Sequence, residues 1–227
     1  MTQPHSASGL IGLYGGSFDP VHLGHTGTAE ELLKRFPFRE IRFLPAARSP
    51  LKTGSLSPAH RLAMLELALE SKQGLTIDSR ELFQPPPSFT IDTLKAVRAE
   101  LAPGQELVFI LGMDSFIELP RWKDWQALTD FAHLLVISRP GHAPKFSGDL
   151  ENWLKKHRIT AAESLESRPR RHGGGRVELI ETRPHAVASR DIRAALRSGQ
   201  DTSRWLNPAV RDYIEQHHLY TGDADPE

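Results

Sequence analysis

Short apolar runs alternate with stretches of helical periodicity along the chain. The first two runs, at residues 10–14 and 41–45, end in turn residues, as strands of a buried parallel sheet do. Together with four later runs they predict strands at residues 10–14, 41–45, 75–78, 106–112, 132–138 and 176–181. The run ELVFILG at 106–112 is the strongest of these signals, and LTID at 75–78 is the weakest.

Apolar residues spaced three and four positions apart predict helices between these strands. The first helix has an apolar face that consists of Ala29, Leu32, Leu33 and Phe36. A second begins with Ser57 as its N-cap and Pro58 at its first position, and its apolar stripe consists of Leu62, Leu65 and Leu69. Two more are predicted over residues 90–101 and from Asn207-Pro208 onward, the latter with Val210, Tyr213, Ile214 and His217 on one side.

This alternation predicts an α/β fold, a Rossmann-like, doubly wound open parallel sheet with helices on both faces. The 227 residues, 39% of them hydrophobic, suffice for one real core. We therefore expect a single domain over residues 10–220, with disordered ends at 1–9 and 221–227. The basic, glycine-rich segment at 167–176 has two interpretations, a mobile surface loop or a contact with a polyanion, and the first is favoured.

Charge and cysteine content exclude several classes of partner and site. Lys and Arg number 28 and Asp and Glu also 28, which argues against a broad surface for nucleic acid or membrane. The chain has no cysteine, so disulfides and thiolate metal sites are excluded. Residues 1–9 lack the features of a signal peptide, and no apolar run approaches the ~18 residues of a spanning helix. We expect a cytoplasmic protein that binds neither nucleic acid nor membrane.

The stretch GGSFDPVHLGH at residues 15–25 follows the first strand, where open parallel sheets commonly bind their ligand. Gly15 and Gly16 would let backbone N–H groups approach an anion, and the helix that follows would add its positive end. His22 and His25 are three residues apart, so they would project together and could stabilise charge on a transferring phosphoryl group. The alternative is that the two histidines only cap and pack the start of the helix.

Two common phosphate-binding motifs are missing from this stretch. The glycines at 12, 15 and 16 do not form the G-x-G-x-x-G fingerprint, and the lysine of a P-loop is also missing. These departures argue against an NAD-dependent oxidoreductase and against a kinase of the P-loop type.

Residues 15–25 resemble the signature G-x-F-D-P-x-H-x-G-H of nucleotidyltransferases of the H-x-G-H type, and every fixed position matches. Members transfer an adenylyl or cytidylyl group from a nucleoside triphosphate and release pyrophosphate. The resemblance implies that His22 and His25 hold the phosphates in the transition state, and that Asp19 contacts the acceptor nucleotide. It also implies an ATP-binding loop that includes Gly15, Gly16, Ser17 and Phe18.

Three further segments are similar to bacterial nicotinate mononucleotide adenylyltransferases. Residues 86–98 resemble that family's S-Y-T-x-x-T-L segment with Phe89 in the tyrosine position, residues 109–125 its F-I-x-G-x-D-S and P-x-W stretch, and residues 138–141 its R-P-G turn. The similarity runs from about residue 10 to 220. It implies that the adenylyl group of ATP is joined to nicotinate mononucleotide, giving deamido-NAD and pyrophosphate in NAD biosynthesis.

The same segments assign further binding residues. Gly112 and Asp114, just past the strongest strand, are expected at the ATP, where Asp114 would accept from a ribose hydroxyl or amino group; alternatively Asp114 caps the next helix. Ser88 and Thr90 are expected at the nicotinate end of the mononucleotide. Trp122 could stack on the pyridine ring, or it could simply fill the core.

Two more motifs carry the expected positive charges. Residues 45–52, PAARSPLK, resemble a family segment ending in P-H-K, so Lys52 is expected to reach a phosphate of the mononucleotide, or else to be a surface lysine without a role. Residues 187–193, VASRDIR, resemble I-S-S-T-x-I-R: Ser189 and Arg193 match and are expected at the triphosphate, where Arg193 can fork onto the β or γ phosphate. Ala188 and Arg190 replace a serine and a threonine, and we expect Arg190 to compensate by its charge.

The expected catalytic residues are thus His22, His25, Lys52 and Arg193. Mg²⁺ is expected to arrive with ATP and to have no dedicated protein ligands, since no carboxylate cluster with metal spacing lies near the loop. Alternative functions are the same chemistry on nicotinamide mononucleotide or phosphopantetheine, and a nucleotide-binding sensor without catalysis. A homo-oligomer is left open.

Overall fold

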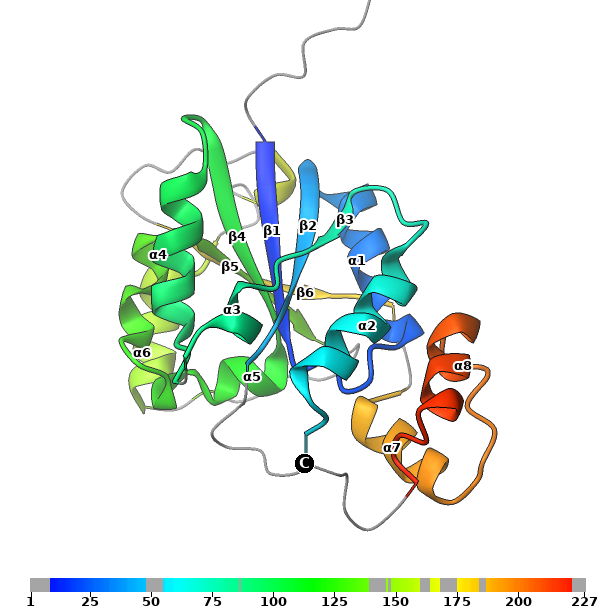
Figure 1. The fold of residues 1–227 in the computed structure, drawn as a ribbon. Coiled ribbons are helices and arrows are strands. Elements are labelled where there is room, and N and C mark those ends of the chain that lie inside the picture. Colours follow the sequence, from blue (N-terminus) through cyan, green and yellow to red (C-terminus); the bar gives the residue numbers. More distant parts are fainter. Residues whose placement is uncertain are drawn as a thin grey trace, which may run out of the picture.

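A computed structural model describes residues 9–47, 55–85, 87–138, 146, 148–159, 164–167, 175–183 and 187–221. These residues form one six-stranded sheet in which all neighbouring strands are parallel (Figure 1). The strands are β1 (Gly9–Gly16), β2 (Phe38–Pro45), β3 (Leu75–Ile77), β4 (Gln105–Gly112), β5 (His133–Ser138) and β6 (Val177–Glu181). All six predicted strands are therefore confirmed.

Helices cover both faces of the sheet, as the α/β prediction requires (Figure 1). They are α1 (Leu23–Arg35), α2 (Pro58–Leu69), α3 (Arg80–Phe83), α4 (Thr90–Glu100), α5 (Met113–Ile117), α6 (Gly148–His157), α7 (Ser189–Arg197) and α8 (Pro208–Gln216), with short 3-10 turns η1 (Leu119–Arg121), η2 (Trp125–Asp130) and η4 (Leu165–Ser167). One buried cluster joins the sheet to α1, α2, α7 and α8, and a second joins its other face to α4, α5 and α6. The Rossmann-like, doubly wound arrangement is thus confirmed.

The predicted helix starts are confirmed by their caps. The Ser57 hydroxyl accepts from the backbone N–H of His60 at the start of α2, and the Asn207 side chain accepts from the N–H of Ala209 at the start of α8. Pro58 and Pro208 occupy first helical positions, where a missing N–H costs nothing.

The predicted stripe of α2 is confirmed at Leu65 and Leu69 and is wrong at Leu62. The buried face consists of Arg61, Met64, Leu65, Ala68 and Leu69, whereas Leu62 is only half-buried. These positions follow the spacing i, i+3, i+4, i+7, i+8, so they form one continuous face. The prediction chose Leu62 because it counted only apolar residues, whereas the face begins with Arg61.

The strand order β3-β2-β1-β4-β5-β6 reverses direction between β1 and β4. The chain leaves β1 for α1 on one face of the sheet and leaves β4 for α5 on the other. The two carboxyl ends, Gly16 and Gly112, lie at the same edge because the strands are parallel. Open α/β sheets bind ligands at such a switch point, so the site is sought there.

The first and last described residues, Gly9 and Thr221, lie one residue outside the expected domain bounds of 10 and 220. β1 begins at Gly9, one residue before the expected start, and Thr221 donates a hydrogen bond to the carbonyl of His218. Residues 1–8, 168–174 and 222–227 lie outside the described residues, so the predictions made for them stay predictions.

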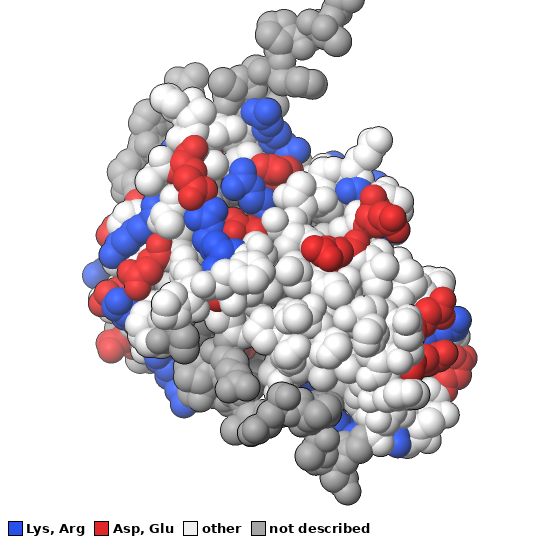
Figure 2. All heavy atoms as spheres, viewed as in Figure 1, with Lys and Arg blue, Asp and Glu red and all other residues white. Residues whose placement is uncertain are grey.

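On the face that Figure 2 shows, Lys and Arg side chains are interspersed with Asp and Glu rather than separated from them by sign. Within the described segments, every helix is too short or too polar to cross a membrane.

Candidate active site

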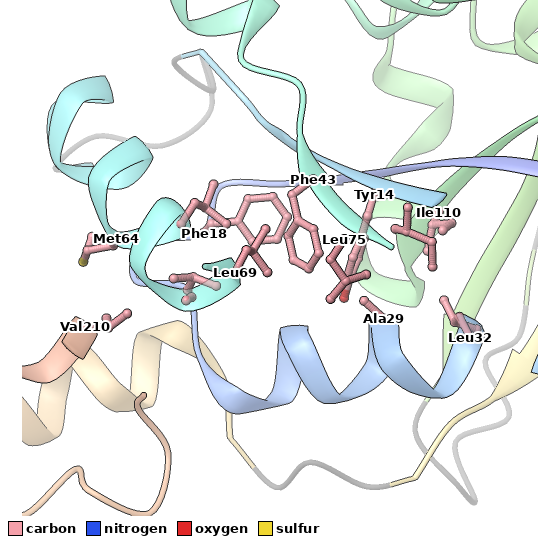
Figure 3. Close-up of a cluster of buried hydrophobic side chains, with 14 of the residues drawn as sticks. Tyr14, Phe18, Ala29, Leu32, Phe43, Met64, Leu69, Leu75, Ile110 and Val210 are labelled. Atoms are coloured by element: carbon pink, nitrogen blue, oxygen red, sulfur yellow. The ribbon is translucent and has the colours of Figure 1, made fainter. Parts of the chain in front are cut away.

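The loop after β1 is shaped by Phe18. Its backbone adopts a left-handed conformation (φ 48°), and its ring is buried at 1% exposure. Figure 3 shows the ring beside Phe43 and Tyr14, with ring centroids 5.2 and 5.8 Å away. The ring therefore lies in the core, and the expected contact of Phe18 with ATP stays a prediction.

Gly15 and Gly16 allow close packing of aromatic rings. A Cβ atom at Gly15 would lie 2.9 Å from atoms of the Phe109 ring, and one at Gly16 would lie 2.9 Å from the Phe18 ring. A side chain at either position would force these buried rings to move. Packing is thus one reason for both glycines, besides the anion contact that the sequence suggested.

His22 and His25 lie together at the start of α1. Their rings are stacked, with centroids 3.7 Å apart and 24° between the planes. His22 is the N-cap residue of α1, is only 7% exposed, and donates its backbone N–H to Nδ1 of His25 at 3.3 Å. The expectation that the two side chains project together is confirmed. The pair also helps to cap the helix, and its role in catalysis stays a prediction.

This capping bond has a chemical consequence for His25. Because Nδ1 accepts a hydrogen bond, the proton of the neutral ring is on Nε2. Nε2 is then the atom of His25 that can donate to a phosphoryl oxygen. The ring is held edge-on against Phe18 at 5.0 Å, which fixes its direction.

The positive end of α1 is partly occupied by the chain itself. The backbone N–H of Leu23 donates to the carbonyl of Trp205 at 2.8 Å. One of the amides that could bind an anion at this helix end is therefore already used. The two histidines gain importance as donors for the same reason.

Asp19 is tied to three other parts of the chain. Its carboxylate is 4% exposed and accepts from the hydroxyls of Tyr220 at 2.6 Å and Ser55 at 3.1 Å. Its carbonyl accepts from Arg193 at 2.6 Å. The sequence assigned Asp19 to the mononucleotide; in the structure its partners are groups of the chain, and the binding role stays a prediction.

The start of α7 lies against this loop. Ser189 donates its hydroxyl to the carbonyl of Pro20 at 3.0 Å, next to the bond between Arg193 and Asp19. The motif VASRDIR and the motif GGSFDPVHLGH, some 170 residues apart, thus meet as the resemblance implied. Arg190 lies differently: its side chain is 83% exposed and contacts its neighbour Asp191 at 3.4 Å.

Arg61 is a site residue that the sequence analysis missed. It is 1% exposed, and its guanidinium donates to the carbonyls of Ser17 at 2.9 Å, Ala47 at 2.5 Å and Leu56 at 3.3 Å. Burial lowers the pKa of this guanidinium, and the nearby Asp19 opposes the shift. The signal was present in the sequence: an arginine four and eight positions before two leucines of one helical face.

Arg61 braces both ends of the segment that carries Lys52. Ala47 and Leu56 flank that segment, and Ser17 belongs to the loop after β1. Lys52 itself lies outside the described residues, so its role stays a prediction.

A buried carboxyl group, Glu81 in α3, was also missed. It is 6% exposed and accepts from the Thr93 hydroxyl at 2.7 Å and from the backbone N–H of Ala47. Burial raises the pKa of Glu81, although both hydrogen bonds oppose the shift. Glu81 therefore joins the chain before Lys52 to the helix that begins with Thr90.

The carboxyl end of β4 is open. Gly112 is exposed, and a Cβ atom placed on it would have no neighbour within 4 Å. Gly112, not Asp114, is the N-cap of α5, and Asp114 is exposed in the first turn without a side-chain capping bond. The capping alternative for Asp114 is therefore not what the structure shows, and its carboxylate faces solvent at the switch point.

Trp122 is half-buried beside the same strand. Its ring meets Phe109 edge-on at 6.3 Å, and Phe109 is the ring that lies against Gly15. Trp122 thus packs on the edge of the core while part of its surface remains accessible. The core interpretation therefore applies to the buried part of the ring, and stacking on the pyridine ring stays a prediction.

The start of α4 contains a buried hydroxyl without a bond. Oγ of Ser88 is inaccessible and finds no hydrogen-bond partner among the described residues. Phe89, the N-cap of α4, supplies no capping side chain, and Thr90 is the first helical residue. Buried hydroxyls normally have a partner, and the expected contact of Ser88 with the mononucleotide stays a prediction.

The described residues contain no group of three or more His, Cys, Asp or Glu side chains that could hold a metal ion. The prediction that Mg²⁺ arrives bound to ATP stays a prediction.

Comparison with known proteins identifies relatives that are similar over nearly the whole chain. Residues 13–195 match the family described as Cytidylyltransferase-like. A protein of Pseudomonas aeruginosa (strain UCBPP-PA14) named "Probable nicotinate-nucleotide adenylyltransferase" is 41% identical over 211 residues, which are 92% of this chain and 96% of the relative. A protein of the same name from Marinomonas sp. (strain MWYL1) is 40% identical over 94% of this chain and 95% of its own.

Solved structures show the same fold. Nicotinic acid mononucleotide adenylyltransferase of Plasmodium falciparum, complexed with NaAD, matches with a TM-score of 0.70 and 22% identity, over 93% of this chain and 97% of that chain. At this level of identity the match supports the fold rather than individual residues.

Proposed function

Because the chain belongs to the cytidylyltransferase-like family, and its relatives at about 40% identity are named as nicotinate-nucleotide adenylyltransferases, we propose that it transfers the adenylyl group of ATP to nicotinate mononucleotide. The products are nicotinate adenine dinucleotide (deamido-NAD) and pyrophosphate, a step of NAD biosynthesis. The observation that carries the proposal is the stacked pair of His22 and His25 at the switch point. Arg193 lies at the same loop, because it is bonded to the carbonyl of Asp19.

The proposed reaction is an in-line displacement at the α phosphorus of ATP. A phosphate oxygen of the mononucleotide forms the new bond to this phosphorus, and the bond to the bridging oxygen of pyrophosphate breaks. Such a reaction needs positioning and charge stabilisation rather than a covalent intermediate. The imidazole N–H groups of His22 and His25 donate to the transferring and leaving phosphates.

Arg193 and Lys52 supply full positive charges to the phosphates. One nitrogen of Arg193 is bonded to the carbonyl of Asp19, which holds the guanidinium at the loop. Its other N–H donors remain for the β or γ phosphate, where a fork of donors suits two oxygens. Mg²⁺ enters as part of the MgATP substrate.

The two nucleotides are assigned to different sets of residues at the carboxyl edge of the sheet. ATP is bound by the loop residues Gly15, Gly16, Ser17 and Phe18, together with Gly112, Asp114 and Ser189. The nicotinate end is bound by Ser88 and Thr90 at the start of α4 and by the ring of Trp122. The orphan hydroxyl of Ser88 supports this side, because a substrate carboxylate would accept its hydrogen bond and also favour the helix N-terminus.

A second candidate, a nucleotide-binding sensor without catalysis, has one observation in its favour. Ala188 stands at the N-cap of α7 without a hydroxyl, and the Arg190 side chain points to solvent. For either function we place the protein in the cytoplasm.

The test is release of pyrophosphate by the purified protein with MgATP and one acceptor at a time. Nicotinate mononucleotide, nicotinamide mononucleotide and phosphopantetheine serve as acceptors. Fast release with the first and slower release with the other two supports the proposal. Preference for another acceptor would reassign the substrate, and no release with any acceptor would favour the sensor.

A further inference from the structure

The chain after α8 places a tyrosine in the interior. His218 and Tyr220 both adopt left-handed backbone conformations, with φ of 50° and 63°, which cost energy for residues other than glycine. Leu219 and Tyr220 are nevertheless buried, at 5% and 1% exposure. The burial of these two side chains offsets the backbone cost, so the segment is shaped to bring Tyr220 inside.

The Tyr220 hydroxyl ends on the loop that carries the histidines. It donates to Oδ1 of Asp19 at 2.6 Å, across 201 positions of sequence, and the bond is buried. A short bond to a carboxylate is among the stronger hydrogen bonds in proteins. Ser55 donates to the other oxygen of the same carboxylate.

Asp19 is the point where three distant parts of the chain meet. Its side chain is held by Tyr220 from the C-terminal segment, and its carbonyl is held by Arg193 from α7. Three residues later comes His22, the N-cap of α1. A displacement of Asp19 that includes its backbone would therefore shift both the carbonyl that anchors Arg193 and the start of the helix with the histidine pair.

We infer that Tyr220 is a positioning residue for adenylyl transfer: its hydroxyl fixes Asp19 and thereby the relative placement of Arg193 and His22. This inference rests on the proposed function. Tyr220 touches no substrate; it acts through Asp19. The effect belongs to turnover rather than to substrate affinity, because errors of a fraction of an ångström in placing reacting groups cost rate.

Tyr220→Phe tests this inference, because it deletes the hydroxyl and keeps the buried ring. Tyr213→Phe is the matched control: the Tyr213 hydroxyl is 3.0 Å from Nδ1 of His60 in the contact between α8 and α2, away from the loop. We expect Tyr220→Phe to lower kcat about tenfold while KM for both substrates changes less than about twofold. Tyr213→Phe should leave both constants within about twofold of wild type.

Thermal unfolding of both variants shows whether a lower kcat is caused by lost stability of the fold or by lost positioning of Asp19. If the wild-type protein releases pyrophosphate and the two variants have equal kcat, the inference is overturned and the proposed function is left intact. A wild-type protein that releases none overturns the proposed function and the inference with it.

Ser55→Ala covers the case in which Tyr220→Phe does not fold. It removes the other donor to the Asp19 carboxylate from a half-buried position, so it should also lower kcat with little change in KM. Wild-type kcat in this variant would then overturn the inference.

Discussion

The imidazole rings of His22 and His25 lie stacked with their centroids 3.7 Å apart at the first turn of α1. The backbone N–H of His22 donates to Nδ1 of His25, which leaves Nε2 of His25 as its donor. The same two residues thus begin the helix and present imidazole groups at the switch point of the sheet. Capping and the proposed catalysis are compatible, because they would use different atoms of the pair.

Replacing His22 by Asn separates these two functions. Asn is among the best N-cap residues but has no imidazole, so α1 should keep its start. We expect turnover to fall by at least ~100-fold, the size of the loss when a key charge-stabilising donor is removed. Steady-state pyrophosphate release measures turnover, and circular dichroism with thermal unfolding checks the fold. A folded His22→Asn variant with nearly wild-type turnover would exclude His22 from the chemistry.

Arg61→Lys should weaken the brace between the loops after β1 and β2. Lysine keeps the charge, but it cannot reach three carbonyls with the geometry of a guanidinium fork. We expect the free energy of unfolding to fall by about 2–4 kcal/mol, since buried acceptors lose a charged donor. Urea unfolding measures the loss.

The control for Arg61 is Arg98→Lys. Arg98 donates to one carbonyl, that of Gln105, at 2.7 Å. Its replacement should cost clearly less than that of Arg61. Equal costs at the two positions would argue against the brace.

Glu81→Gln should change the pH dependence of stability. Burial raises the pKa of Glu81 above its ordinary value of 4.5, so the folded protein binds this proton more tightly than the unfolded chain does. Folding of the wild type is therefore favoured at low pH and loses this contribution as pH rises through the raised pKa. Glutamine cannot ionise, so the stability of the variant relative to wild type should increase with pH.

Glu100→Gln provides a control of opposite sign. Hydrogen bonds from Arg80 lower the pKa of Glu100, so its contribution is present above the ordinary pKa and is lost as pH falls through the lowered one. Relative to wild type, Glu100→Gln should become less stable as pH rises through this window. Urea unfolding from about pH 3 to about pH 8 measures both series. A pH-independent difference for Glu81→Gln would refute a raised pKa.

Arg190→Thr restores the hydroxyl residue found in the related motif. If the charge of Arg190 compensates for the missing hydroxyls, its loss should raise KM for ATP by about two- to fivefold, as expected for an exposed charge. Arg197→Thr, at the other end of the same helix, is the control and should leave KM unchanged. An unchanged or lower KM for ATP in Arg190→Thr would show that Arg190 does not compensate.

The sheet and the main helices could be predicted because their signals are local. Apolar runs located all six strands, and the cap at Ser57-Pro58 located the start of α2 to the residue. The motifs also indicated which loops meet at the carboxyl edge of the sheet. The short helices α3 and α5 were missed because four or five residues are too few to show a helical period. Helix α6, ten residues long, was also missed.

The internal partners of the site residues could not be predicted. Asp19 was read as a ligand residue, but its bonds to Tyr220 and Ser55 join positions 201 and 36 residues away in sequence, and a single sequence does not encode such pairings locally. From the sequence, Gly15 is predicted only to let the backbone approach an anion, whereas in the structure it also makes room for the ring of Phe109. Arg61 was overlooked because a charged residue on a buried helical face looks like a surface position until its three acceptors are seen.

The central claim is transfer of the adenylyl group from ATP to nicotinate mononucleotide, and the most direct measurement follows that group. The protein is incubated with MgATP labelled at the α phosphate and with nicotinate mononucleotide, and the labelled products are separated by chromatography and identified by mass. We predict that the label moves into nicotinate adenine dinucleotide with wild-type protein and moves at least ~100-fold more slowly with His22→Asn. Label that stays in ATP, or appears only in free AMP, would contradict the proposal.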